Sequence, residues 1–233
     1  MTANYRLERK NDGLGGKYEK LLADPQVREY LELADEAMAS IGYTEHGIRH
    51  VTLVAENAAK VLQALGFSEE EVESAKIAGL LHDIGNLVSR EVHPQIGAVL
   101  AHPILLRFGL VARQVGTILG AIGNHEEESG VAFNAVNAAL IIADKADVHR
   151  SRVRDYQPEL EDIHDDVNYA CVEAELDVDA KARTITLKLE IDTEIATLME
   201  YFEIFTSRMV VSREAAEYLE AKFRLVINGT VLS

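Results

Sequence analysis

Apolar residues recur every three or four positions through most of the first 170 residues, which is the pattern of helices packed on a core. The segment from Glu45 to Leu65 shows this pattern most clearly. The period predicts helices over residues 25–40, 45–65, 68–83, about 110–125, 134–148 and 158–170, and another that begins at His93 and Pro94. We therefore expect a helical body.

Capping residues mark where several of these helices begin. Asp24 followed by Pro25 is typical of an N-cap with proline at the first helical position. Ser68 and Glu71 have the spacing of a capping box. Residues 1–16 show no period, and we expect them to form a loosely held arm without a function of its own.

After Ala170 the spacing of apolar residues changes from a helical period of 3.6 residues to the period of 2 that is typical of strands. Residues 172–178 and 183–191 alternate like the two strands of a hairpin joined through 179–182. Two helices, 194–207 and 212–223, and an alternating stretch over 224–231 are predicted to follow. The expected fold is mainly α, a helical bundle over 1–170 with a small α+β appendage over 171–233, packed on the bundle or used for dimerisation.

Composition and charge narrow the class of protein. A chain of 233 residues with an apolar fraction of 48% is long enough to bury a substantial core. Its single cysteine, Cys171, can form neither an internal disulfide nor a thiolate metal site alone. With no signal-like or membrane-spanning stretch, we expect a cytoplasmic protein. The formal charge of -16 argues against binding a nucleic acid polymer, although a local basic pocket could hold a small phosphorylated ligand.

Candidate metal ligands occur on three of the predicted helices. His82 and Asp83 end one helix, where the backbone can bend at Gly85 so that adjacent side chains reach a common point. His50 lies at the edge of an apolar helix face, and Asp144 interrupts the most apolar segment. Nitrogen and carboxylate ligands without thiolate suit Mn, Fe, Co, Ni, Mg or Zn.

The order of these ligands resembles that of the HD-domain superfamily of metal-dependent phosphohydrolases. Residues 50–55 resemble the first-histidine helix of that family, 80–85 its Leu-His-Asp-Ile-Gly element, and 143–147 its final aspartate helix. The resemblance covers about residues 25–155. It implies a helical core that holds one divalent metal ion, and its four expected ligands are His50, His82, Asp83 and Asp144.

Two further histidines, His93 and His125, resemble the His-Pro and His-Glu elements of HD enzymes with two metals. They imply a second site, with Asp83 bridging between the two ions. The chain departs from the cyclic-dinucleotide phosphodiesterases, because Asn124 replaces a frequent histidine, Asn86 replaces a lysine, and the Gly-Tyr-Pro signature is absent. We therefore do not expect specificity for cyclic-di-GMP, and a centre with one ion or with two stays open.

Basic residues follow Asp144 closely. Arg150, Arg152 and Arg154 could pair with the acidic stretch after them, or recognise a phosphate. Arg150 lies six residues past Asp144, less than two helical turns away, so that its guanidinium could reach an anion at the metal. Lys145 could act as an electrostatic group or form an ordinary surface pair, and the same alternatives apply to Asp147.

The resemblance thus implies hydrolysis of a small phosphoester, such as a nucleotide, by metal-activated water. The residues expected to take part in catalysis are Asp83, His125, Lys145 and Arg150. In one alternative the domain binds metal and nucleotide as a regulatory module without turnover, with the appendage as its partner surface. In another it is an HD-type di-iron oxygenase, a group with similar ligands.

Overall fold

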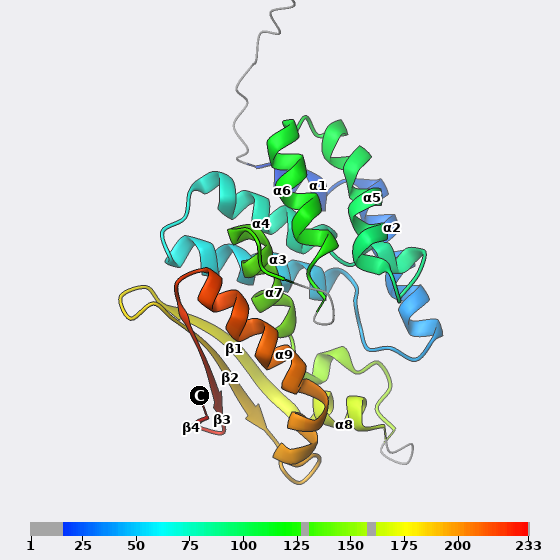
Figure 1. Cartoon of the computed structure of the whole chain (residues 1–233). Helices are drawn as coiled ribbons and strands as arrows, with labels where there is room; N and C mark the ends of the chain where they lie inside the picture. Colours follow the sequence, from blue (N-terminus) through cyan, green and yellow to red (C-terminus); the bar gives the residue numbers. More distant parts are fainter. Residues whose placement is uncertain (1–15, 127–130, 158–161, 233) are drawn as a thin grey trace, which may run out of the picture.

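The computed structural model describes residues 16–126, 131–157 and 162–232 (Figure 1). The predicted arm lies outside the described residues except for Gly16. A short helix that the period did not predict, α1 (Lys17–Leu22), packs against α4 through buried Tyr18 and Leu21. The predicted helix start at Pro158 also lies outside the described residues.

The described residues up to Ala170 fold into a helical bundle, as predicted. Its elements are α2 (Pro25–Ser40), α3 (Ile48–Ala64), α4 (Glu69–Leu81), the 3-10 turn η1 (Ile84–Leu87), α5 (His93–Arg107), α6 (Ala112–Gly123), α7 (Ala135–Lys145), the 3-10 turn η2 (Arg150–Arg152) and α8 (Ile163–Ala170). The Asp24 side chain accepts a hydrogen bond from the Val27 amide at 3.0 Å, and Ser68 with Glu71 forms the predicted capping box.

Helices α3, α4 and α7 pack together at the centre of the bundle (Figure 1). Every residue of α7 from Val136 to Lys145 is buried, which explains why this segment is the most apolar in the chain. The crossing of α3 and α4 is close because Gly79 faces the α3 backbone: a Cβ at this position would lie 2.6 Å from Ala55 Cα. Gly85 similarly lets η1 approach the first turn of α5, where a Cβ would overlap the carbonyl oxygen of His93.

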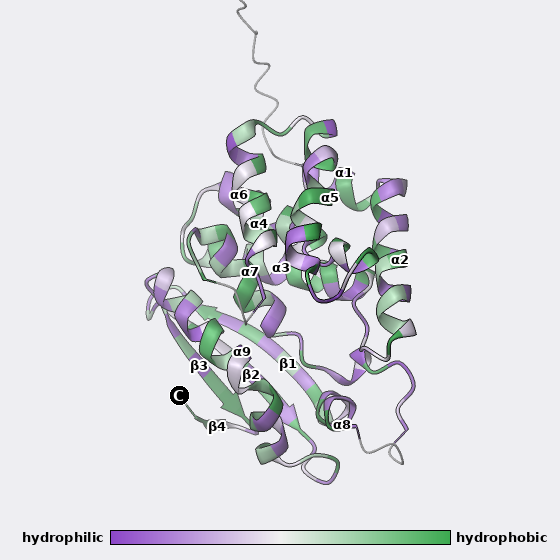
Figure 2. Ribbon diagram, turned by 45° about the vertical axis from the view of Figure 1, so that its right-hand side comes forward, coloured by the Kyte–Doolittle hydropathy of each residue, from purple (hydrophilic) through white to green (hydrophobic). Residues whose placement is uncertain are grey.

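The C-terminal part contains a four-stranded sheet of order β1-β2-β3-β4, formed by β1 (Cys171–Asp179), β2 (Thr184–Ile191), β3 (Lys222–Ile227) and β4 (Thr230–Val231). The first two strands form the predicted antiparallel hairpin. β3 runs parallel to β2, and the connection between them is a single helix, α9 (Leu198–Tyr218). Hydropathy alternates along β1, as expected for a strand with one face in the core (Figure 2).

The prediction of two helices in this region was wrong. α9 is continuous because no glycine or proline separates the two predicted segments, and Ser212, expected to begin the second helix, is a buried residue within α9. Phe223 lies in β3 rather than at a helix end. The helix ends earlier because Glu220 adopts a left-handed backbone conformation, with φ of 55°.

Helix α9 joins the sheet to the bundle. It contacts α7 on one side and β3 on the other, and buries Tyr201 and Phe205 completely or nearly so. The appendage therefore packs on the helical body. Within the described residues, no helix combines the length and the apolar character needed to cross a membrane.

Candidate metal centre

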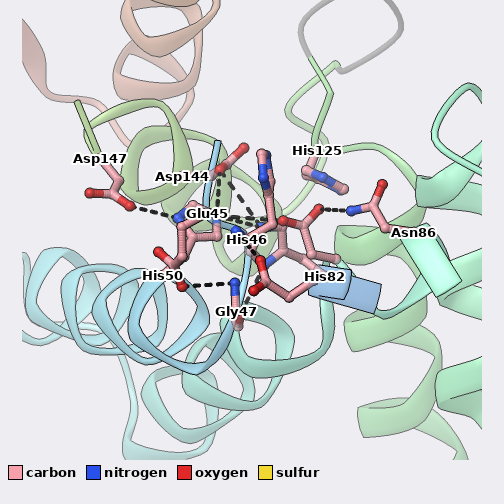
Figure 3. Close-up of polar contacts among 12 residues, drawn as sticks. Glu45, His46, Gly47, His50, His82, Asn86, His125, Asp144 and Asp147 are labelled. Carbon is pink, nitrogen blue, oxygen red and sulfur yellow. Dashed lines mark hydrogen bonds and ion pairs between the residues drawn. The ribbon is translucent and has the colours of Figure 1, made fainter. Parts of the chain in front are cut away.

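Six side chains predicted as metal ligands converge where several helices begin or end. Figure 3 labels four of them, His50, His82, His125 and Asp144. His50 lies in the first turn of α3, His82 caps the C-terminus of α4, and Asp83 follows directly. Asp144 is the penultimate residue of α7. His93 begins α5 and His125 follows the end of α6, so the bundle brings both into the same buried region.

Four of these residues form a first group. His50 Nε2 lies 3.3 Å from His82 Nε2 and 3.5 Å from Asp83 Oδ2. It also lies 3.3 Å from Asp144 Oδ1, which is 3.7 Å from His82 Nε2. Two imidazoles and two carboxylates thus direct nitrogen and oxygen atoms toward one small volume.

A second group shares Asp83 with the first. The other carboxylate oxygen, Asp83 Oδ1, lies 3.5 Å from His93 Nε2, which is 3.2 Å from His125 Nε2. Asp83, His93 and His125 could hold a metal ion together, and so could His50, His82 and Asp83. Asp83 is therefore placed to bridge two ions, while Asn86 Nδ2 donates a hydrogen bond of 2.9 Å to its Oδ1.

The opposite ring nitrogen of each histidine is held by an acceptor. His82, His93 and His125 direct Nδ1 at the backbone carbonyl three residues earlier, at 2.7–2.8 Å, and His50 directs Nδ1 at Asp147 Oδ2, at 2.7 Å. A carbonyl can only accept, so Nδ1 must carry the proton. The Nε2 lone pairs then face the centre, which is the arrangement of histidines that ligate metals.

These contacts test whether a metal ion fits the site. Two Nε2 atoms that both carry lone pairs repel one another at 3.2–3.3 Å unless a metal ion or a proton lies between them. Asp83 Oδ2 is buried and accepts no hydrogen bond of ordinary geometry among the described residues, an expensive arrangement for a carboxylate without a cation. The residues present therefore fit a divalent ion.

Burial and charge perturb the acid–base properties of the site. Burial lowers the pKa of His82, but the Asp83 and Asp144 carboxylates outweigh it and raise this pKa to about 10. Burial also lowers the pKa of His93, and with the nearby His82 it holds the pKa of His125 well below its usual range. A proton can therefore occupy the first group when no ion is bound, whereas the second group favours neutral imidazoles.

Asp147 occupies the side of His50 away from His125 (Figure 3). Arg49 donates to both of its carboxylate oxygens at 3.3 and 2.9 Å, and buried Arg152 lies 3.6 Å from Oδ2. Despite burial, which alone would raise it, Arg152 and His50 hold the pKa of Asp147 far below the usual range. The carboxylate is thus charged and fixed behind His50.

The predicted catalytic cations lie in different places. Lys145 Nζ is 2.9 Å from Asp144 Oδ2, directly beside the first group. The guanidinium of Arg150 lies 5.1 Å from the centre of the Tyr169 ring, and its role as a phosphate clamp stays a prediction. Arg154 pairs with Asp35, which lies far before the arginine run and not in the acidic stretch after it.

Two charged residues at the site were not predicted. Arg90 lies three residues before His93, with Nη1 3.2 Å from both ring nitrogens of that histidine. Glu126 directly follows His125, and its Oε2 lies 3.4 Å from His93 Nε2. Both residues lie in irregular segments, where the spacing of apolar residues does not predict which way a side chain points. Their nearness in the sequence to His93 and His125 was the only feature that could have indicated them.

Comparison with known proteins identifies a family. The model of the family described as HD domain matches residues 47–165. An uncharacterized protein of Methanocaldococcus jannaschii is 31% identical over 160 residues, covering 59% of this chain and 61% of that protein. Ribonuclease Y of Streptococcus sanguinis is 28% identical over 174 residues, covering 64% of this chain and 30% of that protein.

Ribonuclease Y of Lawsonia intracellularis is 33% identical over 105 residues, which cover 44% of this chain and 18% of the relative. In each of these comparisons, the matched region spans less than two thirds of the relative. No solved structure matches the chain significantly.

Proposed function

The chain belongs to the HD domain family, and from that premise we propose that it hydrolyses a small phosphoester in a reaction that depends on a divalent metal ion. One observation carries the proposal: four imidazole Nε2 atoms and two carboxylates converge, while the Nδ1 atom of every one of these histidines is held by an acceptor. Such a set binds a Lewis acid, and hydrolysis of phosphate esters is the chemistry implied by the family.

In this proposal His50, His82, Asp83 and Asp144 hold the ion. When bound, the ion supplies an acidified water molecule and positive charge beside the phosphoryl oxygens. Asp147 keeps the proton of His50 on Nδ1, so that Nε2 stays directed at the site. The ammonium of Lys145 stands beside Asp144 and can counter the negative charge that develops on phosphorus-bound oxygens.

Two other groups can assist the reaction. The guanidinium of Arg90 lies between His93 and Glu126 and offers a planar donor for an anionic substrate. The lowered pKa of His125 keeps its Nε2 without a proton near neutral pH, which suits a ligand better than a donor to the leaving oxygen. We therefore assign His125 with His93 to a second ion.

The substrate proposed is a small phosphorylated molecule. A formal charge of -16 repels a polyanion at long range. Lys145 and Arg90 place positive charge beside the candidate ligands, where a small anion can reach it. The two ribonuclease Y relatives make a phosphodiester of RNA the competing substrate. A panel of nucleotides, other phosphomonoesters, phosphodiesters and a short RNA, each assayed with Mn²⁺, separates these classes.

The decisive variant is Asp83→Ala. It should lose metal content, measured by elemental analysis, and turnover on any substrate found with the panel, because it removes the carboxylate shared by both groups. Glu36→Ala, an exposed position on α2, is the control and should retain both. Full metal content and full activity in Asp83→Ala would overturn the proposal.

The same preparations test the alternatives. Metal binding without turnover of any phosphoester would favour a regulatory module. Consumption of O₂ by the iron-loaded protein, with a mixed-valent iron spectrum, would favour an oxygenase.

A further inference from the structure

Glu126 directs its carboxylate at the second group of ligands. Its Oε2 lies 3.4 Å from His93 Nε2 and 3.7 Å from His125 Nε2. The side chain is only 22% exposed, so it lies within the site rather than on the outer surface. It approaches the atoms of both histidines that carry the free lone pairs.

The second group needs another negative ligand. His93 and His125 are held through Nδ1 by backbone carbonyls, and both act as neutral donors through Nε2. The carboxylate predicted to join His93 and His125 is Asp83, which the first group shares and whose Oδ1 also accepts a hydrogen bond from Asn86; Asp144, which lies near His125, belongs to the first group and pairs with Lys145. A second carboxylate would balance more of the charge of a divalent ion.

Two cations hold Glu126 in this position. Arg90 Nη2 lies 3.4 Å from Oε1, and Lys145 Nζ lies 3.5 Å from Oε2. Arg90 in turn stacks on the Tyr43 ring, with its guanidinium carbon 5.4 Å from the ring centre. The carboxylate is thus fixed by residues of two separate segments and needs little reordering to bind an ion.

We propose that Glu126 is a ligand of a second divalent ion, which it holds together with His93, His125 and Asp83. This inference rests on the proposed function, since it requires that the first group also binds metal. The competing role for Glu126 is structural, as the partner of Arg90 and Lys145. The two roles differ in one measurable quantity, the number of ions that the chain binds.

The test uses Glu126→Gln, which keeps the size of the side chain and removes its charge. Equilibrium dialysis against Mn²⁺ with elemental analysis gives the number of ions and their dissociation constants. We expect two ions in the unmodified chain, and in Glu126→Gln a dissociation constant for the weaker ion raised by about 10-fold to 100-fold or more. The stronger ion should bind as before. Glu91→Gln, an exposed glutamate two residues before His93, makes the same change in charge and should bind two ions normally.

Electron paramagnetic resonance provides an independent reading. Two Mn²⁺ ions that share the Asp83 carboxylate should be magnetically coupled, and the coupled spectrum should disappear in Glu126→Gln and in His93→Ala. Circular dichroism of the metal-free variants establishes that they are folded. Glu126→Asp, which keeps the charge on a shorter side chain, should recover part of the coupled spectrum.

Each outcome decides a separate question. Two ions with unchanged constants in Glu126→Gln, when His93→Ala has lost one, would overturn the role of Glu126 and leave the proposed function standing. A single ion in the unmodified chain would do the same. Failure of the unmodified chain to bind any divalent metal would overturn the proposed function as well.

Discussion

The crossing of α3 and α4 makes Gly79→Ala a direct test of how the fold sets the metal centre. His50 and His82 reach one another because these two helices approach closely at Gly79. The carbonyl of Gly79 also accepts the hydrogen bond from His82 Nδ1 at 2.8 Å. A methyl group added here should therefore affect both stability and metal binding.

The structure sets the size of the effect. The new Cβ would lie 2.6 Å from Ala55 Cα, against 3.4–4 Å for ordinary contact, so the helices must separate by about 1 Å. Overpacking of this kind costs about 1–3 kcal/mol. Alanine is intrinsically better than glycine inside a helix by roughly 0.5–1 kcal/mol, which offsets part of that cost. Gly116→Ala in α6, where a Cβ meets nothing within 4 Å, isolates this gain and is the matched control.

Chemical denaturation of the metal-free variants measures the difference. We expect Gly79→Ala to be less stable than Gly116→Ala by about 1–3 kcal/mol, which is roughly 2–12 °C in Tm for a chain of this size. Its Mn²⁺ affinity should fall about 10-fold or more, since a ligand displaced by more than about 0.5 Å no longer matches the ion. Equal stability and equal affinity in the two variants would refute the claim that this contact positions the ligands.

Two further predictions concern protons and charge at the site. Because the pKa of His82 is raised to about 10 in the metal-free chain, metal binding at pH 8 should release about one proton, measured by calorimetry in buffers of different ionisation enthalpy; no release would contradict this protonation state. The raised pKa also means that His82 contributes stability below about pH 6.5 that is lost as the pH rises through about 10, so the metal-free protein should be destabilised in alkali. Asp147→Asn should lower metal affinity about 10-fold to 100-fold and destabilise the fold by about 3–5 kcal/mol, because it removes the carboxylate that faces buried Arg152, whereas Arg49 keeps its ion pair with Glu45. The stability gap should narrow below about pH 4, where the wild-type Asp147 becomes protonated on unfolding, and a gap independent of pH would contradict the account.

The spacing of apolar residues and the capping residues were sufficient to predict most of the helices. The bundle follows them closely because its helices have apolar faces and, at Asp24 and Ser68, side chains that cap their first turns. The signals failed at α9, where the number of helices depended on packing against α7 and the sheet rather than on local sequence. The parallel pairing of β2 with β3 was equally inaccessible, since strand order depends on contacts between distant segments.

For the site, the sequence predicted which residues would meet but only part of the charge around them, namely Lys145 and Asp147. His50, His82, Asp83 and Asp144 have a recognisable order, and the fold brings them together. The positions of Arg90 and Glu126 depend on the paths of two irregular segments, for which a sequence carries no periodic signal. Likewise, the spacing of the arginine run could not show that Arg152, rather than Arg150, turns toward Asp147.

Helix ends explain why this site can be built with so few supporting side chains. The last carbonyls of a helix have no partner within it, and a histidine just beyond the end can satisfy one through Nδ1–H while its Nε2 faces away. His82 and His125 both use the carbonyl three residues earlier in this manner, and His93 uses one in the turn before α5. His50 lies within a helix, where the carbonyls bond to later amides, and it needs a carboxylate instead. For this reason His50 is the one histidine of the four whose Nδ1 is held by a side chain, that of Asp147, and not by a backbone carbonyl.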